Sequence, residues 1–469
     1  MPIIDRYTKA YLIGIGGSGI STLARWFNQQ GMQVWGYDRA STKLTDQLCR
    51  EGIGIHFTED PADIPAAILH NKAQTLVVYS PAIPKQQALR QYLHEQGYAC
   101  YKRAEILGMI TQQYFTVAIA GTHGKTTTSG LMAHILITAG KNVTAFLGGI
   151  AKGYDTNLLI SGAEDKDRIV VIEADEFDHF FLHLHPNIAI ITTVDPDHLD
   201  IYQDQVGFEK GFCDFVRRVP ADGEVIVQQA ARQRLLSHGP MRHMREYAQA
   251  GSPINAANIR IDQGQFCFYY VGESVTIRDI TLPVPGYHQL ENALGVITAC
   301  LAMGLSPAAI RHGIHTFAGM QRRFDYVIRH PDLIFLDDYG HHPVEIEALL
   351  RTLRQVHPGK SITVVFRPNL YTRTRDFADE FAQSLSLADH VFLLDIYPDR
   401  EEPIEGVCAT SIFEKIALQD KHLCTTQDVL EQLAAQGKPE VIVALGSGGV
   451  SPWVPTIKAW LLKLLQEQD

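Results

Sequence analysis

The strongest constraint on the fold is a glycine-containing loop that ends in Gly-Lys-Thr, between an apolar run and a helical pattern. Residues 117–120 are an unbroken apolar run, typical of a strand buried on both faces of a sheet. After the loop, apolar residues recur at helical spacing over 131–136 and stop before Gly140. Strand, loop and helix in this order are the context of a phosphate-binding loop.

The residue types in this loop suit a phosphate group. Gly121 and Gly124 let main-chain amides approach an anion closely, and the following helix directs free N–H groups and its positive dipole end at it. Lys125 adds positive charge, and Thr126 or Thr127 can offer a hydroxyl to Mg²⁺. Only the second half of the full pattern G-x-x-x-x-G-K-[ST] is present. The alternative is a glycine-rich turn with an exposed lysine, but the flanking strand and helix favour a phosphate site.

Length and composition narrow the class of protein. A chain of 469 residues exceeds one usual core, and about 150 residues per domain suggests three domains. The net charge of −11 provides no basic surface for nucleic acid or an anionic membrane. Seven scattered cysteines without C-x-x-C pairs fit reduced thiols in a cytoplasm. Because neither a signal-like N-terminus nor a long apolar run is present, we expect a cytoplasmic protein that is not membrane-spanning.

The first domain carries a second glycine loop. Residues 9–20 read as a strand entering G-x-G-x-x-G, and the next predicted strand ends at Asp38. A glycine loop followed by an acid about twenty residues later is typical of a site for NAD, FAD or any nucleotide diphosphate. The alternative is a tight turn between strand and helix. A further apolar run, 75–79, closes at Ser80, which can face a ligand, and we place the end of this domain at residue 113.

Carboxylates follow two apolar runs of the central region. Glu173 comes directly after the run 169–172, which places it near the phosphate loop to hold or water-bridge Mg²⁺. His198 lies among three carboxylates at the end of the next run, beside this candidate metal site. For the acidic residues behind Glu173, a solvated turn is the alternative. His288 and Asn292 lie one turn apart on a predicted helix, and an asparagine can bond an adenine edge.

The last region reads as alternating strands and helices after a hinge at 319–327. The adjacent Arg322 and Arg323 point in different directions if extended, so that one can face a phosphate while the other pairs structurally. Helices are expected at 344–356 and 376–387. Polar residues gather after its first two strands, where an α/β sheet binds ligands. They are Asp337, Asp338, Tyr339, His341, His342, Arg367, Arg373 and Arg375.

These patterns predict an α/β protein of three domains, each with a largely parallel sheet. Residues 1–113 form a Rossmann-like N-terminal domain, and residues 114–322 form a central P-loop domain. Residues 323–469 form a Rossmann-like C-terminal domain.

Eight motifs in order resemble the Mur ligase family: GIGGSG, AGTHGKTTT, EADE, DPDHLDIY, PGYHQLEN, MQRRFD, DDYGHHP and YTRTRD. The resemblance covers nearly the whole chain. It implies an ATP-dependent ligase that joins an amino acid to UDP-N-acetylmuramic acid in peptidoglycan synthesis. The first motif and the last two are most similar to the branch that adds L-alanine. The branch that recycles murein tripeptide shares the centre, but typically has a cysteine in its first glycine loop and lacks YTRTRD.

The resemblance also implies ATP and Mg²⁺ as cofactors and assigns residues by position. The ATP-binding residues are Gly121, Thr122, His123, Gly124, Lys125, Thr126, Thr127, His288, Asn292, Arg323 and Asp338. The metal ligands are Thr126 for one Mg²⁺ and Glu173 and His198 for a second. The UDP-sugar and alanine sites comprise Gly16, Gly17, Ser18, Gly19, Asp38, Ser80, Tyr339 and Arg373. The catalytic residues are Lys125, Glu173, His198 and His341.

One feature departs from the family pattern, and a second, a modified lysine, is not assigned to a position in this chain. The family usually has P-H-R-Y before its last motif, whereas this chain has Asn369 and Leu370 in place of the histidine and arginine. Several members carry a carbamylated lysine after the D-H motif, and Lys210 lies nearby in the sequence.

The implied reaction proceeds through an acyl phosphate, because a carboxylate is a poor electrophile. The alanine amine then attacks, and His341 or His342 is the candidate proton acceptor. Since an acyl phosphate hydrolyses in water, we expect the third domain to close over the second. The partners are small molecules, and the protein is a monomer or homodimer. The rival functions are a P-loop phosphotransferase or motor, a dinucleotide-dependent oxidoreductase and a non-catalytic nucleotide sensor.

Overall fold

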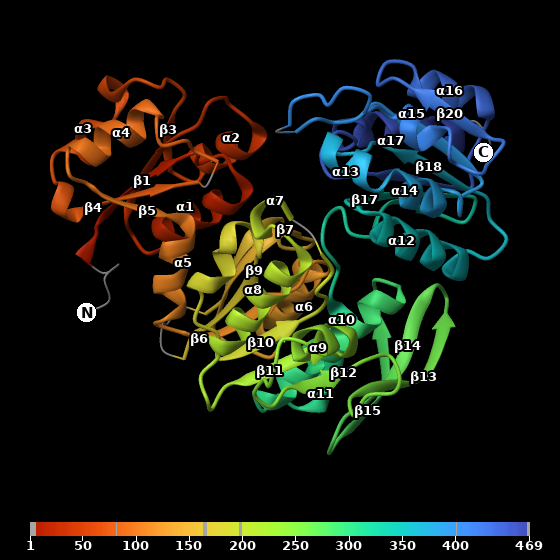
Figure 1. The fold of residues 1–469 in the computed structure, drawn as a ribbon, viewed down its shortest axis with the longest axis horizontal. Coiled ribbons are helices and arrows are strands. Elements are labelled where there is room, and N and C mark those ends of the chain that lie inside the picture. Colours follow the sequence, from red (N-terminus) through yellow and green to blue (C-terminus); the bar gives the residue numbers. More distant parts are fainter. Residues whose placement is uncertain (1–5, 81, 163–166, 197–198, 400, 467–469) are drawn as a thin grey trace. The chain divides into compact units, whose positions relative to one another are not determined.

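Apolar runs and helical patterns alternate along the chain, and they fold into three large sheets whose strands are mostly parallel (Figure 1). The structure is a computed structural model that describes residues 6–80, 82–162, 167–196, 199–399 and 401–466. Contacts group the chain into two compact units. The first comprises residues 1–255, 270–277 and 291–317, and the second comprises 256–269, 278–290 and 318–469. The α/β prediction is confirmed, whereas the domain boundaries after residues 113 and 322 stay predictions.

The first sheet is parallel, with strand order β3-β2-β1-β4-β5. Its strands are β1 (Lys9–Ile13), β2 (Gln33–Tyr37), β3 (Gly54–His56), β4 (Thr75–Tyr79) and β5 (Ala99–Lys102). Its helices are α1 (Ser18–Gln29), α2 (Lys43–Arg50), α3 (Ala66–Leu69), α4 (Ala88–Glu95) and α5 (Arg103–Thr111), with short 3-10 turns at Pro61–Asp63 and Lys72–Gln74. Ile13 is paired with Tyr37 and with Tyr79, so the segments after β1, β2 and β4 emerge at one edge.

The second sheet has strand order β12-β11-β10-β6-β9-β7-β8, and only β7 and β8 among its described pairs run antiparallel. Its strands are β6 (Phe115–Ala120), β7 (Val143–Ala151), β8 (Thr156–Ile160), β9 (Ile169–Ala174), β10 (Ile188–Ile191), β11 (Glu224–Gln228) and β12 (Arg245–Tyr247). Its helices are α6 (Lys125–Thr138), α7 (Leu199–Tyr202), α8 (Gln205–Arg217), α9 (Gln229–Leu236), α10 (Tyr287–Ala302) and α11 (Pro307–Thr316), with a 3-10 segment at Phe177–His183.

The first two sheets belong to one packed unit. A single hydrophobic core runs from Leu12 in β1 to Ile172 in β9. Helix α1 contacts β7 and β8, with the Trp26 and Phe146 ring centroids 6.5 Å apart. Arg25 Nη1 also donates to Asn157 Oδ1 at 3.0 Å. The two glycine loops are therefore held in one unit by side-chain packing.

A small sheet of β13 (Asn255–Asp262), β14 (Gln265–Val271) and β15 (Thr276–Leu282) precedes α10. Farther along the chain, α11 packs against α6, where a Cβ on Gly313 would lie 2.9 Å from the Ile135 Cα. The close approach of these two helices explains why glycine occupies this position.

The third large sheet has strand order β16-β17-β21-β18-β19-β20, and β16 runs antiparallel to β17. Its strands are β16 (Asp325–His330), β17 (Leu333–Asp338), β18 (Ile362–Phe366), β19 (His390–Leu394), β20 (Lys421–Cys424) and β21 (Val441–Leu445). Its helices are α12 (Pro343–Val356), α13 (Tyr371–Asp376), α14 (Ala378–Leu385), α15 (Thr410–Phe413), α16 (Val429–Gln436) and α17 (Val454–Gln466), with a 3-10 turn at Ser451–Trp453.

The structure refines two local predictions for this region. The helix predicted at 376–387 corresponds to α14 at 378–385, and the preceding short helix α13 at 371–376 was not predicted. The predicted hinge at 319–327 begins just after the boundary between the two units at residue 318, and its last three residues belong to strand β16. The hinge motion itself stays a prediction.

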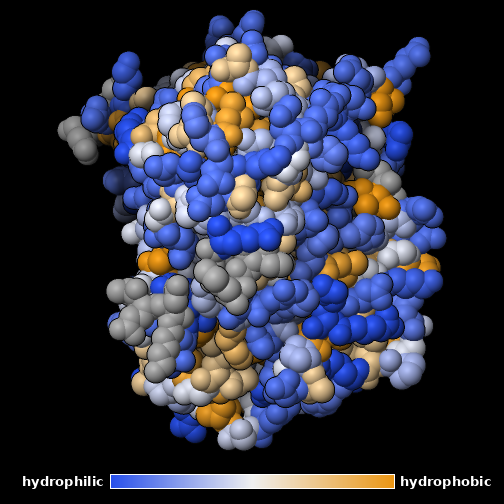
Figure 2. All heavy atoms as spheres, turned by 90° about the vertical axis from the view of Figure 1, so that its left-hand side faces the viewer, coloured by the Kyte–Doolittle hydropathy of each residue, from blue (hydrophilic) through white to orange (hydrophobic). Residues whose placement is uncertain are grey.

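The distribution of side chains on the surface is that expected when most hydrophobic residues are buried. On the face drawn in Figure 2, hydrophobic side chains lie in scattered small groups among hydrophilic ones. Over the residues that the structure describes, no helix combines the length and the apolar character needed to cross a membrane.

Candidate functional site

The phosphate loop is the turn between β6 and α6. Gly121 and Gly124 have φ of +139° and +82°, a region that favours glycine. A Cβ on Gly121 would overlap the Thr192 hydroxyl. The loop therefore needs glycine at both positions, as its sequence predicted.

The segment after β10 braces this loop from the neighbouring strand. Thr122 Oγ1 donates to the Asp195 carbonyl at 2.6 Å, and the His123 amide donates to Thr193 Oγ1 at 2.9 Å. Thr192 Oγ1 donates to the His123 carbonyl at 2.6 Å. Thr122 and His123 thus shape the loop through these contacts, while their contact with ATP stays a prediction.

Lys125, the first residue of α6, is held by a buried carboxylate. Its Nζ donates to Glu176 Oε2 at 2.8 Å and Oε1 at 3.0 Å, and to the Gly121 carbonyl at 2.6 Å. Burial lowers the pKa of Lys125, but the carboxylates of Glu176, Asp175 and Glu173 outweigh it and raise the pKa above its usual value. The ammonium is therefore charged at neutral pH.

Thr126 and Glu173 lie together at the edge of the central sheet. Glu173 pairs with Ile119 in register, directly before the loop, and Thr126 Oγ1 donates to Glu173 Oε1 at 3.1 Å. The Gly148 amide donates to Glu173 Oε2 at 2.8 Å and fixes the carboxylate. A hydroxyl and a carboxylate are ligand types that Mg²⁺ accepts, so this pair fits the ion. Of the two threonines considered from sequence, Thr126 has the printed bond to Glu173, while Thr127 is buried in α6.

The predicted ligand His198 lies outside the described residues, so the full metal set is untested. Within the residues described, no group of three or more histidine, cysteine or acidic side chains is arranged to hold a metal ion. Lys210 is exposed on α8, whereas the adjacent Glu209 is buried and lies 2.6 Å from His238 Nε2.

Asn292 also lies at the phosphate loop. It is 7% exposed, and a Cβ on Gly124 would lie 2.8 Å from its Nδ2. His288, in the first turn of the same helix, is exposed and lies beside Gly286. The adenine contact predicted for Asn292 and His288 stays a prediction.

The first glycine loop gathers its predicted residues. The Gly16 amide donates to Asp38 Oδ2 at 2.7 Å, and a Cβ on Gly14 would lie 3.4 Å from the Ser80 Cβ. Gly17 is the N-cap of α1 and has no side-chain cap, which leaves the start of that helix to an anion. Ser18 and Gly19 are the first two residues of that helix.

Arg103 is a functional candidate that sequence reasoning missed. Its Nε donates to the Gly19 carbonyl at 2.9 Å, and its guanidinium lies over the Phe180 ring at 5.0 Å. The carboxylates of Asp175 and Glu173 act on it electrostatically, although burial has the larger effect and lowers its pKa. Its position just after β5 was the available signal, because polar residues at the carboxyl end of a parallel strand face the ligand edge.

In the second unit, Arg322 is the structural member of the arginine pair. Its guanidinium donates to the Gly446 carbonyl and, at 2.7 Å, to the Ser447 carbonyl. Arg323 lies 3.9 Å from Glu345. Both guanidinium groups lie over the Tyr339 ring, at 5.0 and 4.6 Å from its centroid.

Asp338 is engaged by main-chain amides. Phe324 N donates to its Oδ2 and Gly340 N donates to its Oδ1, each at 2.7 Å. Arg322 and Phe324 have φ of +59° and +48°, which is unusual for residues with a side chain. Asp338 therefore holds this strained segment, and its contact with ATP stays a prediction.

The two candidate bases have different surroundings. His341 Nδ1 lies 3.1 Å from the Tyr339 carbonyl, and burial lowers the pKa of His341 to about 4, although Glu345 raises it. His341 is therefore neutral at pH 7. His342 caps α12 by accepting from Val344 N at 3.4 Å. The structure thus gives His342 a helix-capping bond.

Only one of the three clustered arginines is buried at this edge. Arg373 is 9% exposed, and its Nη1 lies 3.4 Å from Asn369 Oδ1. Arg367 donates to the Asp395 and Gly449 carbonyls, and Arg375 pairs with the neighbouring exposed Asp376. Asn369, where the family usually has histidine, therefore contacts the arginine predicted to bind the amino acid.

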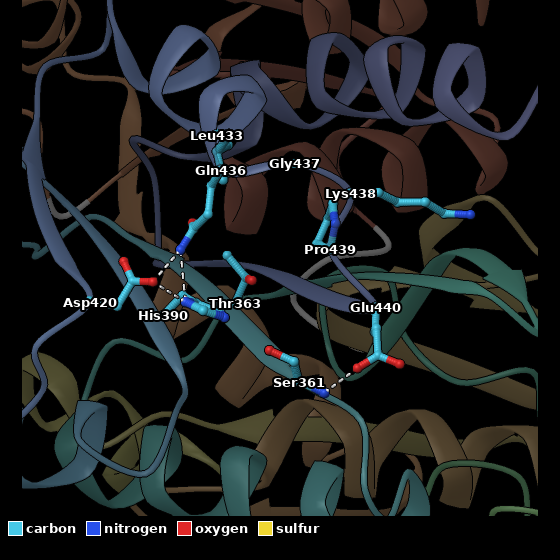
Figure 3. Close-up of a pocket in the computed structure, with 10 residues that line it drawn as sticks. All are labelled: Ser361, Thr363, His390, Asp420, Leu433, Gln436, Gly437, Lys438, Pro439 and Glu440. Carbon is cyan, nitrogen blue, oxygen red and sulfur yellow. Dashed lines mark hydrogen bonds and ion pairs between the residues drawn. The ribbon is translucent and has the colours of Figure 1, made fainter. Parts of the chain in front are cut away.

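A pocket of about 390 Å³ opens at the opposite edge of the same sheet, at the amino ends of β18 to β21 (Figure 3). There Asp420 contacts His390 Nδ1 and Gln436 Nε2, each at 2.6 Å, and His422 Nε2 at 2.8 Å. Asp420, His390 and Gln436 bond one another in this pocket, which favours a structural role for these three side chains.

Comparison with known proteins identifies the chain's relatives. It matches the Mur ligase family catalytic domain over residues 9–115, the Mur ligase middle domain over 119–300 and the Mur ligase glutamate ligase domain over 322–448. It is 42% identical to the UDP-N-acetylmuramate–L-alanine ligase of Christiangramia forsetii, over 98% of this chain and 99% of that protein. It is 40% identical to the protein of the same name from Cytophaga hutchinsonii, over 96% of each.

Solved structures show the same fold. The UDP-N-acetylmuramate-alanine ligase of Thermotoga maritima superposes with a TM-score of 0.80 at 24% identity, over 98% of this chain and 100% of that one. A murein peptide ligase from Psychrobacter arcticus gives 0.67 at 23% identity, over 97% and 98%.

Proposed function

Because this chain belongs to the Mur ligase family, we propose that it is an ATP-dependent ligase that joins L-alanine to the carboxylate of UDP-N-acetylmuramate. The observation that carries the proposal is 42% identity to a ligase of that name over nearly the full length of both chains. The reaction belongs to peptidoglycan synthesis, and through it to cell-wall biogenesis, cell shape and division. We place it in the cytoplasm, with the protein as a monomer or homodimer.

The phosphate loop is the proposed site for the ATP phosphates. The amides of residues 121–126 surround the anion, and the charged Lys125 reaches the β and γ phosphates. Thr126 would supply an oxygen ligand for one Mg²⁺, and Glu173 and His198 would hold a second. When bound, Mg²⁺ neutralises charge on the phosphates and on the reacting carboxylate.

The proposed chemistry has two steps. Lys125 stabilises the charge that develops as the γ-phosphoryl group passes to the muramate carboxylate, which forms an acyl phosphate. The alanine amine then attacks the acyl carbon, an amide bond forms and phosphate leaves. Neutral His341 accepts the amine proton, and the charged Arg373 binds the alanine carboxylate beside Tyr339.

The first glycine loop is the proposed site for the UDP-sugar. The uncapped start of α1 suits the diphosphate, and Asp38 and Ser80 lie beside the loop. Since Asp38 already accepts from the Gly16 amide, it orders the loop as well as offering its carboxylate to the ligand.

Phosphate release from ATP and Mg²⁺ tests the proposal. The purified protein is assayed with UDP-N-acetylmuramate and, in turn, L-alanine, glycine, L-serine or murein tripeptide. We expect release that requires the sugar nucleotide and is fastest with L-alanine. A preference for the tripeptide would identify a recycling ligase, and release that ignores every acceptor would exclude an amide ligase.

A further inference from the structure

Glu176 is a buried carboxylate whose contacts the ligase reaction does not yet use. It lies three residues after Glu173 and is 1% exposed. Both of its oxygens accept from Lys125 Nζ, at 2.8 and 3.0 Å. The lysine that is proposed to bind ATP is thus already paired with an anion.

An ammonium group has three N–H donors. In this structure its close acceptors are the Gly121 carbonyl at 2.6 Å and the two oxygens of Glu176. A phosphate oxygen can therefore bond to Lys125 only by replacing one of these acceptors. Glu176 carries a negative charge, as phosphate does, whereas the Gly121 carbonyl is neutral. Phosphate and Glu176 therefore compete for the same N–H donors of Lys125.

The main chain around Glu176 is fixed. Tyr202 Oη donates to the Glu176 carbonyl at 2.6 Å, and His179 N donates to the same carbonyl at 3.1 Å. Phe181 N donates to the Asp175 carbonyl at 2.9 Å. Because the backbone is anchored, the carboxylate stays within reach of Lys125 and can pair with it again once a nucleotide leaves.

We propose that Glu176 is a positioning residue that holds Lys125 in the nucleotide-free protein and competes with nucleotide phosphates for it. Glu176 thereby weakens nucleotide binding and speeds the release of ADP. This inference rests on the proposed function, because it takes the phosphate loop to be the ATP site.

The test is the nucleotide affinity of Glu176→Gln, which keeps the side-chain shape and removes the charge. Titration calorimetry with Mg²⁺-ADP and with a non-hydrolysable ATP analogue measures the dissociation constants. We expect both constants to fall about tenfold, because a buried negative charge beside the phosphates is removed. A fluorescent ADP analogue should dissociate more slowly by a similar factor.

Asp178→Asn is the matched control. It removes one negative charge from the same segment, but Asp178 is exposed and pairs with Lys102 at 3.3 Å. We expect its nucleotide affinity to stay within about twofold of the wild type. An equal tightening in both variants would indicate general electrostatics and would overturn the inference.

Thermal unfolding separates competition from a merely structural role. Without nucleotide, Glu176→Gln should melt below the wild type, because Lys125 loses its buried partner. Saturating ADP should raise the melting temperature of the variant more than that of the wild type. Unchanged or weaker nucleotide binding would overturn the proposal.

If Glu176→Gln does not fold, Glu176→Asp replaces it. The shorter side chain keeps its charge but draws back from Lys125, so nucleotide affinity should rise several-fold, and an unchanged affinity would again contradict us. These measurements need neither the sugar nucleotide nor L-alanine. A protein that binds nucleotide as predicted but forms no amide would refute the proposed function alone.

Discussion

Asn292 lies directly against Gly124, the glycine that ends the phosphate loop. A Cβ on Gly124 would lie 2.8 Å from Asn292 Nδ2 and 3.0 Å from its Oδ1. Helix α10 therefore supports the loop through this buried amide. Since Gly124 also has φ of +82°, two separate constraints require glycine at this position.

Gly124→Ala should weaken nucleotide binding more than it weakens the fold. The added methyl group meets both the strained dihedral angle and Asn292, so we expect roughly 1 to 3 kcal/mol less stability. The displaced loop should lose on the order of tenfold or more in nucleotide affinity. Urea unfolding and titration calorimetry measure the two effects.

Gly140→Ala is its control. Gly140 has a similar φ of +76°, but a Cβ there would have no neighbour within 4 Å. It should cost about 1 kcal/mol through backbone strain and leave nucleotide affinity unchanged. If Gly124→Ala behaves in the same way, the contact with Asn292 does not shape the loop.

Arg322 and Arg323 should separate into a stability residue and an activity residue. Arg322→Gln leaves the Gly446 and Ser447 carbonyls without their donor and should lower the free energy of unfolding by about 2 kcal/mol. Arg323→Gln should lower the free energy of unfolding by less than about 1 kcal/mol, since it loses a 3.9 Å ion pair with Glu345 and a contact with the Tyr339 ring, and its side chain is partly exposed. Arg323→Gln should also lower kcat/KM for ATP at least about tenfold, because it loses a charge-assisted contact with phosphate. Equal stability losses in the two variants would contradict this division.

The phosphate loop could be predicted from the sequence because the residues that indicate it are close together in the chain. The apolar run at 117–120, the two glycines and Lys125 specify strand, turn and helix within one short segment, and β6 and α6 begin and end close to the predicted bounds. Glu173 lies beside the phosphate loop as predicted, because it directly follows an apolar run, while its role as a metal ligand stays a prediction.

Glu176 and Arg103 were missed because tertiary packing gives them their roles. From sequence alone, the acidic residues at 175–178 could equally form a solvated turn. That interpretation is correct for Asp178, which is exposed. Glu176 is buried, and its contacts come from distant parts of the chain: Lys125 pairs with its carboxylate, and Tyr202 donates to its main-chain carbonyl. Similarly, no sequence spacing relates Arg103 to Gly19, which is 84 residues away.

The carboxyl group of Asp337 should make stability depend on pH. Burial raises its pKa to about 6, despite the opposing effect of Arg322. Because the folded state binds this proton more tightly than the unfolded chain, its contribution is fully present below the unfolded pKa of about 3.8 and is lost as pH rises through 6. The loss is on the order of 2 to 3 kcal/mol.

Urea unfolding of the wild type and Asp337→Asn between pH 4 and 7.5 measures this slope. The wild type should lose stability relative to the variant as pH rises. Asp332→Asn is the control on the same hairpin, since Asp332 has a side chain 71% exposed and should show no such trend. A constant difference between wild type and Asp337→Asn would contradict the raised pKa.

The pH profile of the rate of alanine transfer should show no inflection near pH 6.5 that comes from His341. Burial lowers its pKa to about 4, so it is already neutral and able to accept a proton across pH 5.5 to 7.5. Of these two groups, only the alanine amine then titrates toward its reactive form in this range, and log(kcat/KM) for L-alanine should rise with a slope of about 1. His341→Gln should lower kcat on the order of 100-fold with little change in the KM for ATP. His342→Gln should retain the rate within about threefold, because His342 caps a helix.

The opposite outcome would be a slope near 2 below pH 6.5 in the wild type and a slope of 1 in His341→Gln. That result would show that His341 titrates at its ordinary pKa, because bound substrates make its ring less buried than in this structure.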